Sequence, residues 1–103
     1  MTRAEKIAWL NDRFRGMSLD VHLTPGVLYG VPDVIGLMKE VETFDAFTPD
    51  NDPYGEHDFG SLVWQDKKIF WKIDYYNRTL QVGEDPLDPT CRRILTIMLA
   101  SEY

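Results

Sequence analysis

The feature that most constrains the fold is an alternation of apolar and polar residues at positions 68–76. Successive side chains of a β-strand point to opposite faces, so this stretch predicts a strand with two different faces. One face carries Ile69, Trp71, Ile73 and Tyr75, and the other carries Phe70, Lys72, Asp74 and Tyr76. A strand with one apolar face and one mixed face is typical of a sheet whose core lies on one side.

The neighbouring segments supply the other elements. The spacing of apolar residues predicts helices over residues 2–15 and 32–41 and strands over 20–24 and 60–65. At the start of the first helix, Thr2 and Glu5 have the spacing of a capping box. The strand at 60–65 should form a hairpin with the alternating strand through a tight turn at Asp66-Lys67. The final segment, Cys91–Tyr103, suits a helix or a buried strand, and we expect a helix.

These elements indicate one α+β domain over residues 1–103. We expect an antiparallel sheet of three to four strands with two to three helices packed on one face. The segment between the second helix and the hairpin should lie at one end of the sheet, against the strand that holds Asp74. In the first helix, Arg13 and Arg15 are expected on a solvated edge.

The negative charge of the chain is concentrated in its middle. The formal net charge is -6, and residues 40–66 contain eight Asp or Glu and no Lys or Arg. Direct binding of nucleic acid is not expected, because contacts with phosphates need clustered cations. An acidic segment favours metal ions or basic protein surfaces, although a solvated loop that aids solubility remains an alternative.

Cysteine content and hydropathy indicate the compartment. The single cysteine, Cys91, excludes an intrachain disulfide, and a reducing cytoplasm fits this composition. No apolar run is long enough to cross a bilayer, and the first residues do not have the pattern of a signal peptide. We therefore expect a cytoplasmic protein that does not bind membranes. Its oligomeric state stays open.

The loop at residues 44–60 holds the residue types that chemistry uses. Its prolines and glycines predict a folded loop, and its Asp and Asn residues are strong turn formers. One divalent metal ion could be held by Asp50, Asp52, His57 and Asp58. A calcium loop beginning at Asp50 fails at Tyr54 and Ser61, where ligands are required. General acid–base chemistry would use His57 and Asp58, with Asp74 from the hairpin.

Three stretches carry a family resemblance: residues 44–60 (FDAFTPDNDPYGEHDFG), 70–76 (FWKIDYY) and 95–103 (LTIMLASEY). Together they resemble a family of short alphaproteobacterial proteins catalogued only as a domain of unknown function. Members of that family are often encoded on plasmids, phages and other mobile elements. The resemblance implies a cytoplasmic bacterial setting and a role in the conflict between mobile elements and their hosts. It implies no catalytic residues.

Two functions are compatible with these observations. The first, which we favour, is a non-enzymatic interaction protein without a cofactor, for example an anti-CRISPR or anti-restriction inhibitor that occupies a basic nucleic-acid-binding surface of a host protein. Its contact residues would be Asp50, Asp52, Tyr54, Glu56, Asp58, Phe59 and Tyr76. The second is a small metal-dependent hydrolase or nuclease that uses the loop from Asp50 to Asp58.

Overall fold

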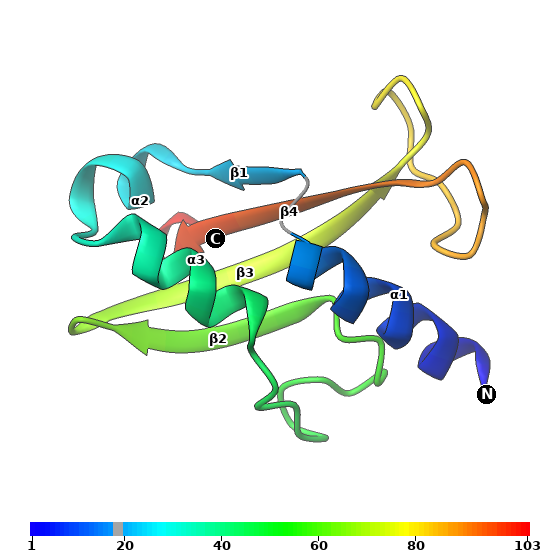
Figure 1. Cartoon of the computed structure of the whole chain (residues 1–103), viewed down its shortest axis with the longest axis horizontal. Helices are drawn as coiled ribbons and strands as arrows, with labels where there is room; N and C mark the ends of the chain where they lie inside the picture. Colours follow the sequence, from blue (N-terminus) through cyan, green and yellow to red (C-terminus); the bar gives the residue numbers. More distant parts are fainter. Residues whose placement is uncertain (18–19) are drawn as a thin grey trace.

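The computed structural model describes residues 1–17 and 20–103 and contains one four-stranded sheet with its helices (Figure 1). The helices are α1 (Arg3–Met17), α2 (Pro25–Gly30), α3 (Val34–Glu42) and the short 3₁₀ helix η1 (Ala100–Glu102). The strands are β1 (Val21–Leu23), β2 (Phe59–Trp64), β3 (Lys67–Tyr76) and β4 (Arg92–Leu99). The strand order across the sheet is β1-β4-β3-β2. The expected α+β class is therefore confirmed.

The sheet is mixed rather than wholly antiparallel. β2 and β4 both pair with β3 in antiparallel fashion, as expected, but β1 pairs with β4 in parallel. The helices α2 and α3 carry the chain from β1 to β2 at the opposite edge. A crossover of this kind joins strands that run in the same direction, so β1 has the same direction as β2 and β4.

The prediction of a helix for the final segment was wrong, because this segment forms strand β4. β4 lies between β1 and β3, so it needs apolar residues on both faces. Leu95 and Ile97 are buried on the helix-covered face, and Ile94 and Met98 are buried on the other. A segment that is apolar on both faces does not alternate between apolar and polar residues. The sequence pattern alone therefore could not distinguish a helix from a strand here.

The hairpin turn is displaced by one residue from the expected position. Gln65 and Asp66 occupy the turn, with φ angles of 47° and 67°. Two consecutive residues of positive φ are typical of the type I′ turn, whose twist matches that of the flanking strands. At the first helix, the predicted capping box is present: the Glu5 backbone N–H donates to Thr2 Oγ1 (3.1 Å) and the Thr2 N–H donates to Glu5 Oε1 (2.9 Å).

The core lies between one face of the sheet and the helices, as the alternation in β3 predicts (Figure 1). The sheet contributes Ile69, Trp71, Ile73, Leu95 and Ile97, and the helical segments contribute Val27, Val31, Leu37 and Val41. Trp71 is fully buried and pairs across the hairpin with Gly60. None of the helices in the described part of the chain is long and apolar enough to span a bilayer.

The close approach of Trp71 to Gly60 gives the first prediction. A Cβ atom added at Gly60 would lie 2.2 Å from Trp71 Nε1, so Gly60→Ala forces a shift in the core. We expect this variant to lower the free energy of unfolding by about 1–3 kcal/mol in urea denaturation. The matched control is Gly16→Ala in α1, where nothing lies within 4 Å of the added atom. An equal loss of stability in both variants would contradict the assigned contact.

Candidate functional site

Aromatic contacts fix the start of the loop at residues 44–60 to the core. The ring of Phe44 packs edge-on against Trp71 at 5.4 Å, and that of Phe47 packs against Trp71 at 6.1 Å. Further along, the side chains of Thr48 and Asn51 each accept a hydrogen bond from the other residue's backbone N–H. The loop is therefore an ordered structure that partly satisfies its own backbone.

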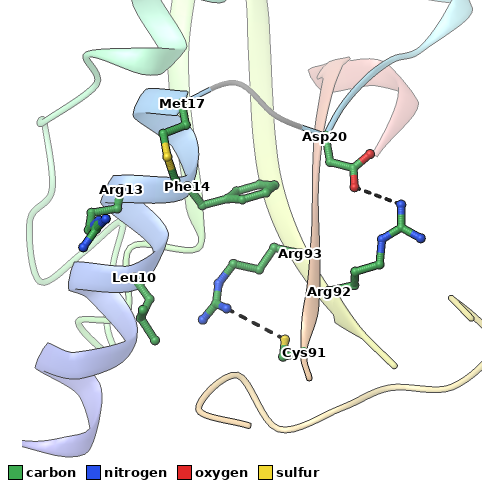
Figure 2. A pocket seen from close by; sticks show the side chains of 8 residues that line it. All are labelled: Leu10, Arg13, Phe14, Met17, Asp20, Cys91, Arg92 and Arg93. Atoms are coloured by element: carbon green, nitrogen blue, oxygen red, sulfur yellow. Dashed lines mark hydrogen bonds and ion pairs between the residues drawn. The ribbon is translucent and has the colours of Figure 1, made fainter. Parts of the chain in front are cut away.

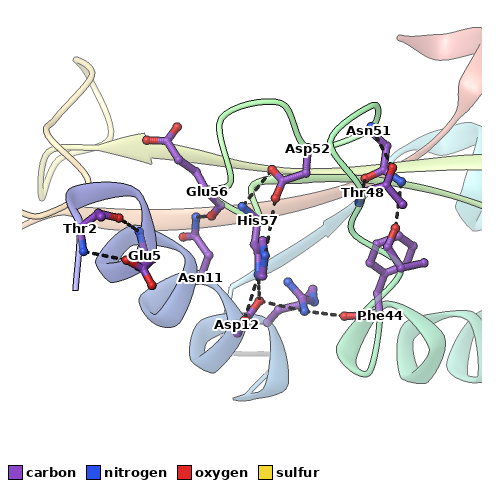
Figure 3. A network of polar contacts seen from close by, with 12 residues as sticks. Thr2, Glu5, Asn11, Asp12, Phe44, Thr48, Asn51, Asp52, Glu56 and His57 are labelled. Atoms are coloured by element: carbon purple, nitrogen blue, oxygen red, sulfur yellow. Dashed lines mark hydrogen bonds and ion pairs between the residues drawn. The ribbon is translucent and has the colours of Figure 1, made fainter.

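His57 holds the loop against α1 (Figure 3). Its Nδ1 lies 3.0 Å from the Asp12 carboxylate, and its Nε2 lies 3.5 Å from Asp52 Oδ2. Its ring stacks on Phe47 with a centroid distance of 3.8 Å and an interplanar angle of 3°. Asp52 also accepts the His57 backbone N–H at 3.2 Å. Both ring nitrogens thus face carboxylates of the protein, which is the arrangement of a structural clamp.

A buried amide links α1, the loop and the sheet, and Figure 3 shows its contact with Glu56 of the loop. Asn11 is fully buried; its Nδ2 donates to the Glu56 carbonyl at 3.0 Å and to the Tyr75 hydroxyl at 2.8 Å. Its Oδ1 accepts a hydrogen bond from Arg93 Nε at 2.7 Å. This role of Asn11 was not predicted from the sequence. The available signal was the position of Asn11 four residues after the buried Ile7, on the same face of the helix.

Arg15 does not lie on a solvated edge, so that expectation was wrong. Its side chain is 3% exposed and donates to the Phe44 carbonyl at 2.8 Å and to Asp12 at 3.2 Å. Its guanidinium lies 4.7 Å above the ring of Trp71, in a cation–π contact. Burial lowers the pKa of Arg15, while the Asp12 carboxylate opposes this shift. Arg13, by contrast, is exposed and stacks on Trp9.

A hollow of about 440 Å³ lies where the loop meets the helix-free face of β2 and β3. We call it the acidic-aromatic hollow, and its main lining residues are Tyr54, Asp58, Phe59, Lys72, Asp74 and Tyr103. Tyr54 is 80% exposed and Tyr103 is 77% exposed. The rings of Phe59, Phe70 and Tyr103 form a cluster with centroid distances of 5.1–5.9 Å. The expected contact between the loop and the strand that holds Asp74 is therefore present.

Carboxylates crowd one side of this hollow. Burial raises the pKa of Asp58, and the nearby Asp52 and Asp74 carboxylates add to the effect, while a hydrogen bond from Tyr75 opposes it. Burial and the Asp58 charge likewise raise the pKa of Glu56. Lys72, the one cation among the described residues that line the hollow, donates to Asp74 at 2.9 Å, and this hydrogen bond raises the pKa of Lys72. An incoming cation would therefore relieve repulsion between carboxylates.

The structure brings together only part of each predicted set. Of the residues predicted to bind a partner, the hollow contains Asp52, Tyr54, Asp58 and Phe59. Tyr76 lies further along the same face of β3, whereas Asp50 is exposed on the loop. The side chain of Glu56 points away from Asn11, and its backbone carbonyl holds the loop (Figure 3). No pattern in the sequence indicates a role for Tyr103, which reaches the hollow because β4 returns beside β3.

The predicted catalytic and metal-binding sets are divided. Asp58 and Asp74 share the hollow, but His57 lines a neighbouring depression that has Asp52 and Tyr54 in common with it. Within residues 1–17 and 20–103, no three His, Cys, Asp or Glu side chains are grouped as a metal ion requires. The predicted metal ligands Asp50, Asp52, His57 and Asp58 are therefore not arranged as one coordination site.

A second hollow, of about 480 Å³, lies between α1 and the start of β4 (Figure 2). Two of its cations have polar partners within the chain: Arg92 pairs with Asp20 at 3.2 Å, and Arg93 donates to the Pro86 carbonyl at 2.7 Å. Burial raises the pKa of the Cys91 thiol on its wall, which disfavours the reactive thiolate. This hollow contains none of the predicted site residues.

The raised pKa of Asp58 predicts how pH affects stability. Because the folded-state pKa lies above the ordinary value of 3.8, ionisation of Asp58 destabilises the folded state. This penalty is absent below pH 3.8 and is fully present above the raised pKa. Asp58→Asn should therefore unfold at a higher urea concentration than the wild type at pH 7, and the difference should shrink on acidification. Asp50→Asn, at an exposed position, is the control. A destabilised Asp58→Asn variant at pH 7 would contradict the burial argument.

Comparison with known proteins identifies the family of the chain. A family model described as "Protein of unknown function (DUF3768)" matches residues 23–102, which include the loop, the whole hairpin and β4. No curated protein and no solved structure matches the chain. The residues that line the acidic-aromatic hollow fall within the matched range, except Tyr103, which lies one residue beyond it. The chain belongs to the DUF3768 family of proteins of unknown function.

Proposed function

We propose that this protein is a non-enzymatic interaction protein that binds a basic surface of another protein through the acidic-aromatic hollow. The observation that carries the proposal is the grouping of Asp52, Asp58 and Asp74 around an open hollow whose described lining residues include a single lysine. The pKa of Asp58, raised by burial and by its carboxylate neighbours, indicates charge that the free protein leaves poorly compensated. A lysine or arginine of a partner would supply that compensation.

The aromatic residues support binding of a protein rather than of a free ion. Tyr54 and Tyr103 stand exposed on the wall of the hollow, and Phe59 lies between the loop and the sheet. Tyrosine gives a large contact area with few rotatable bonds, and it is enriched among the residues that dominate binding energy. An arginine of the partner can pair with a carboxylate and stack on a tyrosine ring at the same time.

The kind of partner follows from the charge of the chain and from the family resemblance. We propose that the partner is a host defence protein of a CRISPR or restriction system. The hollow would compete with nucleic acid for the lysine and arginine side chains of that partner. Residues 40–66 carry eight acidic side chains and no basic ones, so they offer a phosphate-like density of negative charge. On this proposal the protein is encoded by a mobile element and acts in the bacterial cytoplasm without a cofactor.

The alternative of a metal-dependent hydrolase has weaker support. The carboxylates Asp58 and Asp74 share a hollow, but His57 is directed at Asp12 and Asp52. Lys72, the nearest cation that could hold a phosphate, is already paired with Asp74. Hydrolysis of a phosphoester needs both a positioned nucleophile and neutralised phosphate charge. The contacts of these residues favour binding over hydrolysis.

Charge reversal tests the proposal. The variant Asp58→Lys/Asp74→Lys changes the hollow, and Glu40→Lys/Glu84→Lys makes the same change in net charge at positions outside it. Circular dichroism first verifies that each protein is folded. Each protein is then immobilised on a resin and incubated with host lysate, and the captured proteins are quantified by mass spectrometry. We expect a basic nucleic-acid-binding protein to be captured by the wild type and the control and lost from the hollow variant.

The captured protein then allows a quantitative test. Calorimetric titration of the purified partner should show affinity weakened by about tenfold or more in the hollow variant, since close charge pairs contribute about 1.5 kcal/mol or more. Added wild-type protein should also displace labelled nucleic acid from the partner. Equal affinity of the hollow variant and the control for the partner would contradict the proposed binding site. Cleavage of nucleic acid by the purified protein alone would favour the hydrolase.

A further inference from the structure

Strand β2 is an open edge of the sheet. It is the last strand in the order β1-β4-β3-β2, and no other strand formed by residues 1–17 and 20–103 borders its outer side (Figure 1). Natural proteins usually protect such an edge with charged residues, prolines or bulges. β2 has the sequence FGSLVW, which contains no charged residue and no proline, and Val63 on it is 70% exposed. This edge is therefore chemically suited to pairing with another strand.

The hydrogen-bond phase of the hairpin shows which backbone groups face outwards. The Ile73 N–H donates to the Asp58 carbonyl at 2.8 Å, which places this pair in hydrogen-bonded register. Hydrogen-bonded pairs alternate along an antiparallel ladder, so the residues of β2 that face β3 are the even-numbered ones. The N–H and C=O groups of Phe59, Ser61 and Val63 consequently point away from β3. No other described segment supplies a backbone hydrogen bond to these three residues.

We propose that β2 pairs with β2 of a second copy of this chain, in antiparallel orientation about a two-fold axis. The two four-stranded sheets then form one continuous sheet. The register places Ser61 opposite Ser61 of the second copy and Phe59 opposite Val63 of the second copy. An edge strand of this kind is self-complementary, because rotation matches each outward N–H with an outward C=O.

The side chains of β2 fit this register on both faces. On the helix-free face, Phe59 lies beside Val63 of the second copy, which joins an aromatic and a β-branched residue, a favourable cross-strand pair. On the helix-covered face, Gly60 lies beside Leu62 of the second copy, so a small residue faces a large one. No charged side chain is buried at the junction, because β2 contains none.

Charge complementarity favours a second copy over an unrelated strand. Antiparallel pairing brings the hairpin turn of one copy beside the loop at the start of β2 in the other copy. The turn contains the exposed Asp66 and is followed by the exposed Lys67 and Lys68, so the lysines outnumber the acid there, and the loop carries Glu56 and Asp58. Opposite charges therefore meet at both ends of the junction. The two-fold axis runs perpendicular to the sheet, so both acidic-aromatic hollows face the same side and could bind a partner bivalently.

Disulfide trapping tests the register. In a Cys91→Ser background, Ser61→Cys places two thiols on the two-fold axis, at a separation of about 5.5 Å between Cα atoms that a disulfide can span. Mild oxidation should give a covalent dimer of twice the 12.0 kDa chain mass. The matched control is Val63→Cys, which the register places opposite Phe59 and which should cross-link far less. Equal or absent cross-linking in the two variants overturns the register.

Sedimentation analysis tests the dimer without cross-linking. Wild-type protein should sediment as a dimer at micromolar concentration, and added salt should weaken this association. Val63→Lys places a charge at an exposed position of the junction and should shift the dissociation constant by about tenfold or more towards the monomer. The control is Val82→Lys, at a 59% exposed position outside β2, which should leave the dimer intact.

Two results would overturn the proposed dimer: a wild-type protein that stays at 12.0 kDa throughout the concentration series, or a dimer that Val63→Lys leaves unchanged. Circular dichroism confirms that each variant is folded. The charge-reversal variants of the hollow are measured separately, with the captured partner. If the protein does not dimerise, the proposed binding function is therefore unaffected. If the hollow does not bind the partner, the proposed dimer is likewise unaffected.

Discussion

The packing around Trp71 is the constraint on which the rest of the structure depends. This side chain is fully buried, and three separate segments close over it: Gly60 of β2, Arg15 of α1 and Phe44 of the loop. Its Nε1 has no hydrogen-bond partner in the described part of the chain, which costs about 1–3 kcal/mol. Burial of so large a ring, together with the cation and aromatic rings around it, offsets that cost. One residue thus determines where hairpin, helix and loop meet.

The same packing explains how an acidic loop can be ordered. Anchored by its aromatic residues, the loop directs His57 towards Asp12 and the Glu56 carbonyl towards the buried Asn11. These contacts use one face of the loop, and the other face meets β3 at the hollow that holds Asp58 and Asp74. The two faces of the loop therefore have different roles. Its structural contacts are made to α1, and its poorly compensated charge is presented on the helix-free face of the sheet.

Local patterns in the sequence predicted the parts that depend on local physics. The alternation in β3 correctly placed Trp71 in the core, and the capping box correctly placed the start of α1. The parts that failed depend on contacts between distant segments. β4 is a strand because it lies between β1 and β3, and Arg15 is buried because the loop, 29 residues later, offers it the Phe44 carbonyl. The spacing of apolar residues along the chain does not predict contacts between such distant segments.

The candidate site shows the same division, and this bears on function. The acidic residues and Tyr54 could be identified as candidates from the sequence. The sequence could not show that His57 makes structural contacts with Asp12 and Asp52, whereas the ionised side chain of Asp58 destabilises the fold. Burial and neighbouring carboxylates raise the pKa of Asp58, so its ionised form works against folding. Natural chains retain destabilising groups of this kind mainly where function needs them. Asp58 is therefore a stronger candidate for partner contact than His57, whose ring nitrogens both face carboxylates of the chain.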